Sequence, residues 1–264
     1  MDIQYIGDGE PDIAIIGTVH GNEPCGEDAL RELRKSASEL NGCILTICVN
    51  ERAAEKNERF IDQDLNRVYP GDLSSKNHEE RLAAIVYHLT KDIPVYDLHS
   101  TKIPTPSGKP FGIFAEKKDN VINRVKNTGV NKTLYFEFDD GSGLHHLESV
   151  EVEHMPKGSE EALKQARSTV DQILAAHNLN DNEENQTEPM IYRVYDSVEK
   201  DGDYDITCSN WNKVEEGEKI ATNESGAIRA SESFIPVIFS EDYDEILGYK
   251  AREPITFEEF QKKN

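Results

Sequence analysis

The sequence predicts an α/β fold followed by a smaller, β-rich C-terminal domain, and three observations support this prediction. Residues 1–177 alternate short apolar runs with longer amphipathic stretches, as strands and helices do. Residues 178–188 are polar, with no apolar residue after Leu179, as in an exposed connector. Beyond them, short apolar runs are separated by clusters of Gly, Asn, Asp and Glu, a pattern typical of antiparallel strands.

Each element of the first segment follows from the spacing of its apolar residues. Apolar runs predict strands at 12–18, 43–50, 93–100, 108–116, 133–138 and 148–154. Amphipathic stretches predict helices at 26–40, 78–91, 119–128 and 159–177. The last helix has a capped start, because Ser159 precedes Glu160 and Glu161.

The polar connector marks a predicted domain boundary, with one domain over residues 1–178 and a small β domain over residues 189–264. The strands predicted for the second domain lie at 190–196, 204–208, 227–231 and 234–240.

The chain is strongly acidic. Its 264 residues include 29 Lys and Arg against 51 Asp and Glu, a formal net charge of −22. Such a charge repels DNA, RNA and anionic membranes, so we expect no nucleic-acid or membrane partner. Because self-repulsion destabilises a compact acidic protein unless salt screens it, we expect a halophile's protein, such as a haloarchaeal one. An acidic mesophilic protein is the alternative.

The cysteines and the N-terminus indicate a soluble, cytoplasmic protein. Cys25, Cys43, Cys48 and Cys208 form no CxxC pair, so we expect free thiols in a reducing compartment. No basic region followed by an apolar stretch begins the chain, and no apolar run approaches the roughly 18 residues of a membrane helix. Homo-oligomer formation is left open.

Two histidines and one glutamate follow or end predicted strands. His20 and Glu23 come directly after the strand at 12–18, and His99 ends the strand at 93–100. In α/β sheets, ligands bind at the carboxyl ends of the strands. Two imidazoles and one carboxylate form the His₂Glu set of catalytic zinc, which leaves one position open for water. Asp64 and Asp97 are candidates to orient the imidazoles.

A second cluster of polar residues is suited to anion recognition. Arg59, Asn66 and Arg67 fall within nine residues. Arginine binds carboxylate through two parallel hydrogen bonds. We therefore expect Arg67 and Asn66 to hold a substrate carboxylate, and Arg59 to stabilise a developing oxyanion.

Three motifs together resemble those of a known family. HGNE at 20–23, RFIDQDLNRVYPG at 59–71 and YDLHST at 96–101 are similar to motifs of the succinylglutamate desuccinylase and aspartoacylase family, a deacylase branch of the zinc carboxypeptidase-like fold. The resemblance implies a mixed sheet flanked by helices, with a C-terminal β domain that helps to cover the active site.

The resemblance also implies roles for individual residues. One zinc ion per chain would bind His20, Glu23 and His99. The substrate carboxylate would bind Asn66 and Arg67, and Arg59 would polarise the scissile carbonyl.

The general base of the family is a glutamate on a late strand, usually followed by Val-Gly. This chain has Glu151, Val152 and then Glu153 in place of the glycine. We favour Glu151 as the base, but Glu153 lies on the same face of a strand and stays open as the alternative.

Two further comparisons concern the substrate. Tyr243 lies near the position of a substrate-contacting tyrosine in the family. Members that act on acidic N-acyl amino acids often carry a second basic residue about ten positions before the base, where this chain has Asp139, Asp140 and Gly141. We therefore do not expect the family's preference for acidic substrates to carry over unchanged.

These observations predict a zinc-dependent deacylase that cleaves the amide bond of an N-acyl amino acid or a similar small carboxylate. A carboxypeptidase that uses the same metal chemistry is one alternative. A non-catalytic zinc-containing sensor of small carboxylates is the other, suggested by Glu153 in place of glycine.

Overall fold

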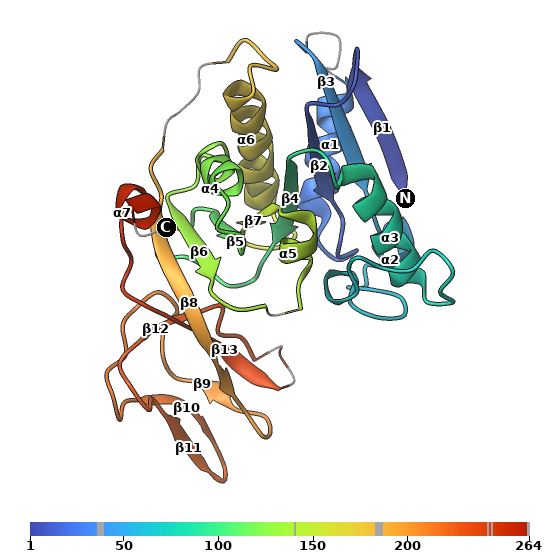
Figure 1. The fold of residues 1–264 in the computed structure, drawn as a ribbon. Coiled ribbons are helices and arrows are strands. Elements are labelled where there is room, and N and C mark those ends of the chain that lie inside the picture. Colours follow the sequence, from blue (N-terminus) through green and yellow to red (C-terminus); the bar gives the residue numbers. More distant parts are fainter. Residues whose placement is uncertain (36–39, 140, 183–186, 242, 244, 263–264) are drawn as a thin grey trace.

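The computed structural model describes residues 1–35, 40–139, 141–182, 187–241, 243 and 245–262. These residues form a mixed α/β fold with a ten-stranded sheet and a separate three-stranded sheet (Figure 1). The large sheet contains, in spatial order, β1 (Asp2–Gly7), β3 (Cys43–Cys48), β2 (Ile13–Gly17), β4 (Val95–Ser100), β7 (Val150–His154), β5 (Phe111–Phe114), β6 (Lys132–Phe136), β8 (Met190–Glu199), β13 (Ile246–Ala251) and β12 (Ile235–Val237).

The central strands of this sheet are parallel. β3, β2, β4 and β7 pair side by side in parallel, whereas β5 runs antiparallel to β7. β1 closes one edge in an antiparallel pair with β3, and β8, β13 and β12 form an antiparallel ribbon at the other. The predicted mixed sheet flanked by helices is therefore confirmed.

Helices cover both faces of the sheet (Figure 1). One face carries α1 (Pro24–Lys35), α4 (Asp119–Lys126), α6 (Glu160–Ala176) and α7 (Phe257–Lys262). The other carries α2 (Glu51–Lys56), the 3₁₀ helix η2 (Leu65–Arg67), α3 (His78–Thr90) and α5 (Gly143–Leu147). Residues 36–39 of the helix predicted at 26–40 lie outside the described part of the chain.

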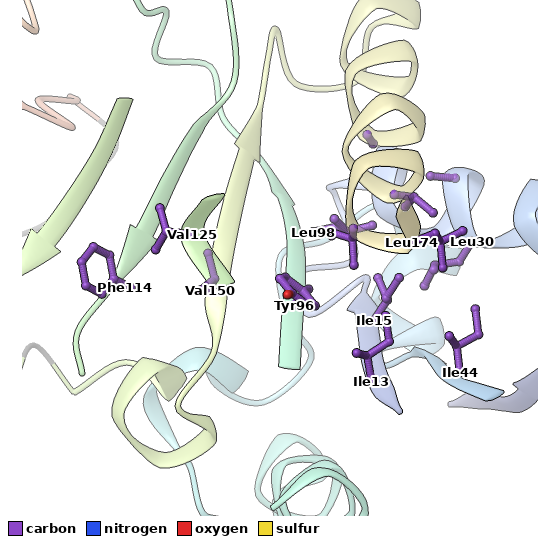
Figure 2. Packing of buried hydrophobic residues seen from close by; sticks show 14 of the residues in the cluster. Ile13, Ile15, Leu30, Ile44, Tyr96, Leu98, Phe114, Val125, Val150 and Leu174 are labelled. Carbon is purple, nitrogen blue, oxygen red and sulfur yellow. The ribbon is translucent and has the colours of Figure 1, made fainter. Parts of the chain in front are cut away.

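The strand β2 is apolar throughout because both of its faces are buried. Ile13 and Ile15 face Leu30 of α1 and Leu174 of α6 (Figure 2). Its alternate residues, such as Ile16, pack in the opposite layer with α3. Burying an isoleucine or leucine side chain contributes about 1.5–3 kcal/mol, so these two layers fix the position of β2 and of the residues that follow it.

The C-terminal segment divides between two sheets. β8, β13 and β12 extend the large sheet, whereas β9 (Asp205–Ile206), β10 (Lys219–Asn223) and β11 (Gly226–Arg229) form the small antiparallel one. The large sheet therefore continues past the connector at 178–188, of which residues 183–186 lie outside the described residues. The division into domains 1–178 and 189–264 stays a prediction.

In the described part of the chain, every helix is too short or too polar to cross a membrane.

Candidate active site

The carboxyl ends of the parallel strands border a cavity of about 570 Å³. The predicted metal-binding, catalytic and substrate-binding residues all lie in its lining: His20, Glu23, Arg59, Asn66, Arg67, His99, Glu151 and Tyr243. The competing base, Glu153, lines it as well. Residues from the strand ends, from the loop around Arg59 and from the C-terminal segment therefore meet around one space.

The chain turns sharply into the site after β2. Thr18 adopts a left-handed conformation with φ of 60°, which is strained for a β-branched residue. A side chain on Gly21 would lie 2.1 Å from the carbonyl carbon of Ala53 in α2. Only glycine fits this close approach, which brings His20 and Glu23 to the start of α1.

His20, Glu23 and His99 form a compact group of ligands. Their ligand atoms lie within 4.8 Å of one another, and all three residues are buried. The strand register brings these residues together, because β2 and β4 are parallel neighbours with Gly17 opposite Leu98. The ligand atoms of Asp97, His99 and Glu151 also lie within 4.8 Å of one another. The first group contains two imidazoles, which zinc prefers.

Both imidazoles contact a carboxylate at each ring nitrogen. His20 Nδ1 lies 3.0 Å from Glu23 Oε1, and His20 Nε2 lies 3.1 Å from Asp64 Oδ1. His99 Nδ1 lies 3.1 Å from Glu23 Oε2, and His99 Nε2 lies 2.9 Å from Asp97 Oδ2.

This arrangement fits a metal ion. A neutral imidazole has a single N–H. When the Nε2 of His20 or His99 donates that hydrogen to its aspartate, the Nδ1 of the same ring keeps a lone pair that points toward Glu23. A cation between these atoms would satisfy the lone pairs and the carboxylate together. Aspartates that hold the remote ring nitrogen are typical partners of metal-binding histidines.

Charge at the group also favours a cation. Burial raises the pKa of Glu23, but His20 and His99 outweigh burial and hold this pKa well below its usual range. Burial lowers the pKa of His99, but Asp97 and the hydrogen bond to Glu23 outweigh it and raise this pKa well above its usual range. The Glu23 carboxylate therefore stays ionised, and positive charge beside it is favourable.

Glu79 holds the loop that carries Arg59 and Asp64. Its buried carboxylate accepts hydrogen bonds from the backbone N–H groups of Ile61 at 2.7 Å and Asp62 at 3.0 Å. Glu79 could not be recognised from the sequence, because the chain has many glutamates at helix starts and the contact spans distant residues. The loop in turn brings Arg59 to 2.9 Å from Asp64 and to 3.5 Å from Glu23.

Asn66 connects η2 to two neighbouring elements. Its Oδ1 accepts a hydrogen bond from the backbone N–H of Gly143 at 2.7 Å, and its Nδ2 donates to Glu151 Oε1 at 3.1 Å. A Cβ on Gly143 would lie 2.8 Å from Asn66 Oδ1, so glycine lets α5 approach this closely. Glu151 is thereby fixed in the cavity lining.

The two candidate bases differ in their partners. Glu151 is buried and bonded to Asn66. Glu153 makes no hydrogen bond or ion pair with a described residue, and its Oε2 is buried. Burial and the nearby Glu23 raise the pKa of Glu153 to about 8. The contact with Asn66 therefore favours Glu151 as the positioned base.

Two further residues border the ligand group without having been selected from the sequence. Lys157 Nζ donates to Asn22 Oδ1 at 2.8 Å and lies 3.6 Å from Glu23 Oε1. His154 Nδ1 contacts the carbonyl oxygen of His99 at 2.8 Å, and burial lowers the pKa of His154 to about 4. A neutral His154 thus donates to the backbone that carries His99.

The fold and the lining define the class of protein: a mixed α/β fold with a candidate His₂Glu metal centre and an arginine-lined cavity. Residues 9–177 match the family model described as the succinylglutamate desuccinylase/aspartoacylase catalytic domain. The match covers more than half of the chain, and the chain belongs to this family, as the motifs predicted.

Individual relatives agree with this assignment. The chain is 36% identical to aspartoacylase of Rattus norvegicus over 106 residues, which cover 34% of each chain. It is 26% identical to succinylglutamate desuccinylase of Pseudomonas aeruginosa over 153 residues, which cover 51% of this chain and 46% of that protein. The chain thus spans about a third to a half of the length of these relatives.

Solved structures show the same fold. Murine aminoacylase 3 superposes with a TM-score of 0.74 at 18% identity, covering 95% of this chain and 98% of that one. A succinylglutamate desuccinylase from Silicibacter superposes with a TM-score of 0.70 at 19% identity, covering 96% of this chain and 88% of that one.

Proposed function

We propose that this chain is a zinc-dependent amidohydrolase that removes the acyl group from an N-acyl amino acid or a similar small substrate that carries a carboxylate. One observation carries this proposal: the His20, Glu23 and His99 group shares a single open cavity with the carboxylate of Glu151. Relatives named aspartoacylase and succinylglutamate desuccinylase support hydrolysis of a linear amide.

Zinc is the metal that best suits this group, and we propose one ion per chain. Two of the three ligands are imidazoles, whereas magnesium and calcium prefer oxygen ligands. When bound, zinc supplies a Lewis acid that makes hydroxide available near neutral pH and polarises a carbonyl oxygen.

Glu151 serves as the general base in this proposal. Its carboxylate takes a proton from the water whose oxygen attacks the amide carbon. As the carbon–nitrogen bond breaks, Glu151 returns the proton to the leaving nitrogen, so the products are a carboxylate and an amine. The hydrogen bond from Asn66 keeps the Glu151 carboxylate turned into the cavity.

The two arginines interact with the two negative charges of the reaction, which are the oxyanion and the substrate carboxylate. Arg59 lies 3.5 Å from Glu23, beside the ligand group, where its guanidinium can stabilise the oxyanion that forms on the amide. Arg67 lines the same cavity and can bind the substrate carboxylate through two parallel hydrogen bonds, with Tyr243 as a further contact.

Product analysis tests the proposal. The zinc-loaded protein is incubated with N-acetyl, N-succinyl and N-formyl amino acids, and separately with N-blocked dipeptides. We expect free acetate, succinate or formate from the first set and no C-terminal amino acid from the second. Release of amino acids from the dipeptides alone would favour a carboxypeptidase, and tight binding without any hydrolysis would favour a sensor.

We also propose a cytoplasmic location and a small carboxylate as the substrate that the protein binds. The free thiols of Cys25, Cys43, Cys48 and Cys208 support a reducing compartment.

A further inference from the structure

Glu153 is an acidic side chain in the wall of the cavity. It lies on β7, beside His99 of β4 and Phe111 of β5 in the register of the sheet. Among the residues that the structure describes, it is the one acidic or basic side chain of the lining without a hydrogen bond or an ion pair. Its Oε2 is buried from solvent and has no partner in that part of the chain.

The other acidic groups of the lining contact neighbouring side chains. Glu23 contacts both imidazoles, and Asp64 contacts His20 and Arg59. Glu151 accepts from Asn66. These three carboxylates therefore have structural or catalytic partners, and Glu153 is left facing the space that a substrate would fill.

Metal binding does not account for Glu153. Neither group of closely spaced ligand atoms found among the described residues includes its carboxylate.

A second basic residue for an acidic substrate is also missing from the nearby segment. Asp139 and Gly141 bring no positive charge, and the Cβ position of Gly141 lies 3.8 Å from Arg67, so this segment adjoins the predicted carboxylate site.

A buried carboxylate without a partner is costly, and a ligand that donates to it recovers the lost interaction. The strongest donor of this kind is a cation, because charge-assisted hydrogen bonds are about twice as strong as neutral ones. The cavity therefore contains a site for positive charge as well as the arginine site for negative charge.

We propose that Glu153 binds an ammonium group on the amine half of the substrate, so that the substrates are N-acyl derivatives of diamino acids. This inference rests on the proposed function for the reaction itself. The α-carboxylate binds Arg67, the amide lies at the ligand group, and the side-chain ammonium reaches Glu153. Glu153 is thus a specificity-determining residue.

The test compares two substrates of matched shape, Nα-acetyl-lysine and Nα-acetyl-norleucine, which differ in the terminal ammonium. We expect the zinc-loaded protein to prefer the lysine derivative by at least about tenfold in kcat/KM, the size of one charged hydrogen bond. In Glu153→Gln this preference should fall by at least about tenfold. An equal loss of kcat for both substrates would overturn the inference, because it would make Glu153 the general base.

A matched control separates the local contact from the overall charge. Glu161 is exposed on α6, outside the cavity lining, and Glu161→Gln changes the net charge by the same amount. We expect this variant to keep the preference for the lysine derivative. Loss of the preference in both variants would assign it to the acidic surface and overturn the role of Glu153.

Calorimetry with the free amines keeps the inference testable if no amide is cleaved. Lysine should bind the zinc-loaded protein more tightly than norleucine, and Glu153→Gln should remove the difference. If no amide is hydrolysed but the two amines still differ in binding, the proposed function alone is overturned. Equal binding of the two amines to the unmodified protein would overturn the inference alone.

Discussion

Asn66 Nδ2 donates a hydrogen bond to Glu151 Oε1 across 3.1 Å, although the two residues lie 85 positions apart in the chain. The same amide accepts from Gly143, so Asn66 joins η2, α5 and β7. The sequence predicts Asn66 as a ligand for the substrate carboxylate, and that role stays a prediction. The structure adds a contact that orients the proposed general base.

Replacing Glu151 tests whether it is the base. We expect Glu151→Gln to lower kcat by about 10²–10⁴-fold, because a general base contributes this much, while the zinc content stays at one ion per chain. Initial rates and metal analysis of the same preparation provide the measurement. Retained hydrolysis in Glu151→Gln, together with its loss in Glu153→Gln, would transfer the role to Glu153.

Asn66 and Arg67 should affect different kinetic constants. Asn66→Ala removes the hydrogen bond to Glu151, so we expect kcat to fall by about tenfold with little change in KM. Arg67→Ala removes the proposed carboxylate contact, so we expect KM to rise by about tenfold or more. Steady-state kinetics of both variants distinguish the two roles. A rise in KM alone for Asn66→Ala would make Asn66 a substrate ligand only.

His177 should make stability depend on pH. Its Nε2 lies 2.7 Å from the Tyr96 hydroxyl and 3.2 Å from Asn127 Nδ2. Burial, assisted by Arg124, lowers the pKa of His177. The unfolded chain therefore binds this proton at a higher pH than the folded protein does, and the stability that neutral His177 contributes is lost as the pH falls below about 6.5.

We expect His177→Gln to be less stable than the unmodified protein at about pH 8, with the difference shrinking toward about pH 5. Urea unfolding midpoints across this range provide the measurement. A difference that stays constant with pH would show that His177 does not change its protonation on unfolding.

Salt should stabilise the fold. With a net charge of −22, the folded chain repels itself, and at about 1 M salt the screening length falls to about 3 Å. We expect the thermal midpoint to rise between about 0.1 M and 1 M potassium chloride. An unchanged midpoint would favour the acidic mesophilic alternative over the halophilic one.

The strands with continuous apolar runs could be predicted from the sequence, because both of their faces are buried. β2, β3 and β4 are buried at every position, and the apolar runs of β2 and β3 stand out most clearly. β1 was not predicted, because it is an edge strand whose one fully buried residue is Ile6. α5 has only five residues and depends on its contact with Asn66 rather than on its own periodicity.

The residues of the site could likewise be predicted only in part. His20, Glu23 and His99 could be selected because they follow or end apolar strands that lie side by side. Glu79 and Lys157 could not, because their roles come from contacts with distant loops. The continuation of the large sheet into β8, β13 and β12 also depends on pairing that spacing alone does not reveal.

The most direct test of the central claim is a crystal structure of the zinc-loaded protein, with anomalous scattering recorded at the zinc edge. We predict one zinc ion per chain, bound by Nδ1 of His20, Nδ1 of His99 and the Glu23 carboxylate at about 2.0–2.2 Å. A zinc ion bound elsewhere, or no ion at these three residues in zinc-loaded crystals, would contradict the account.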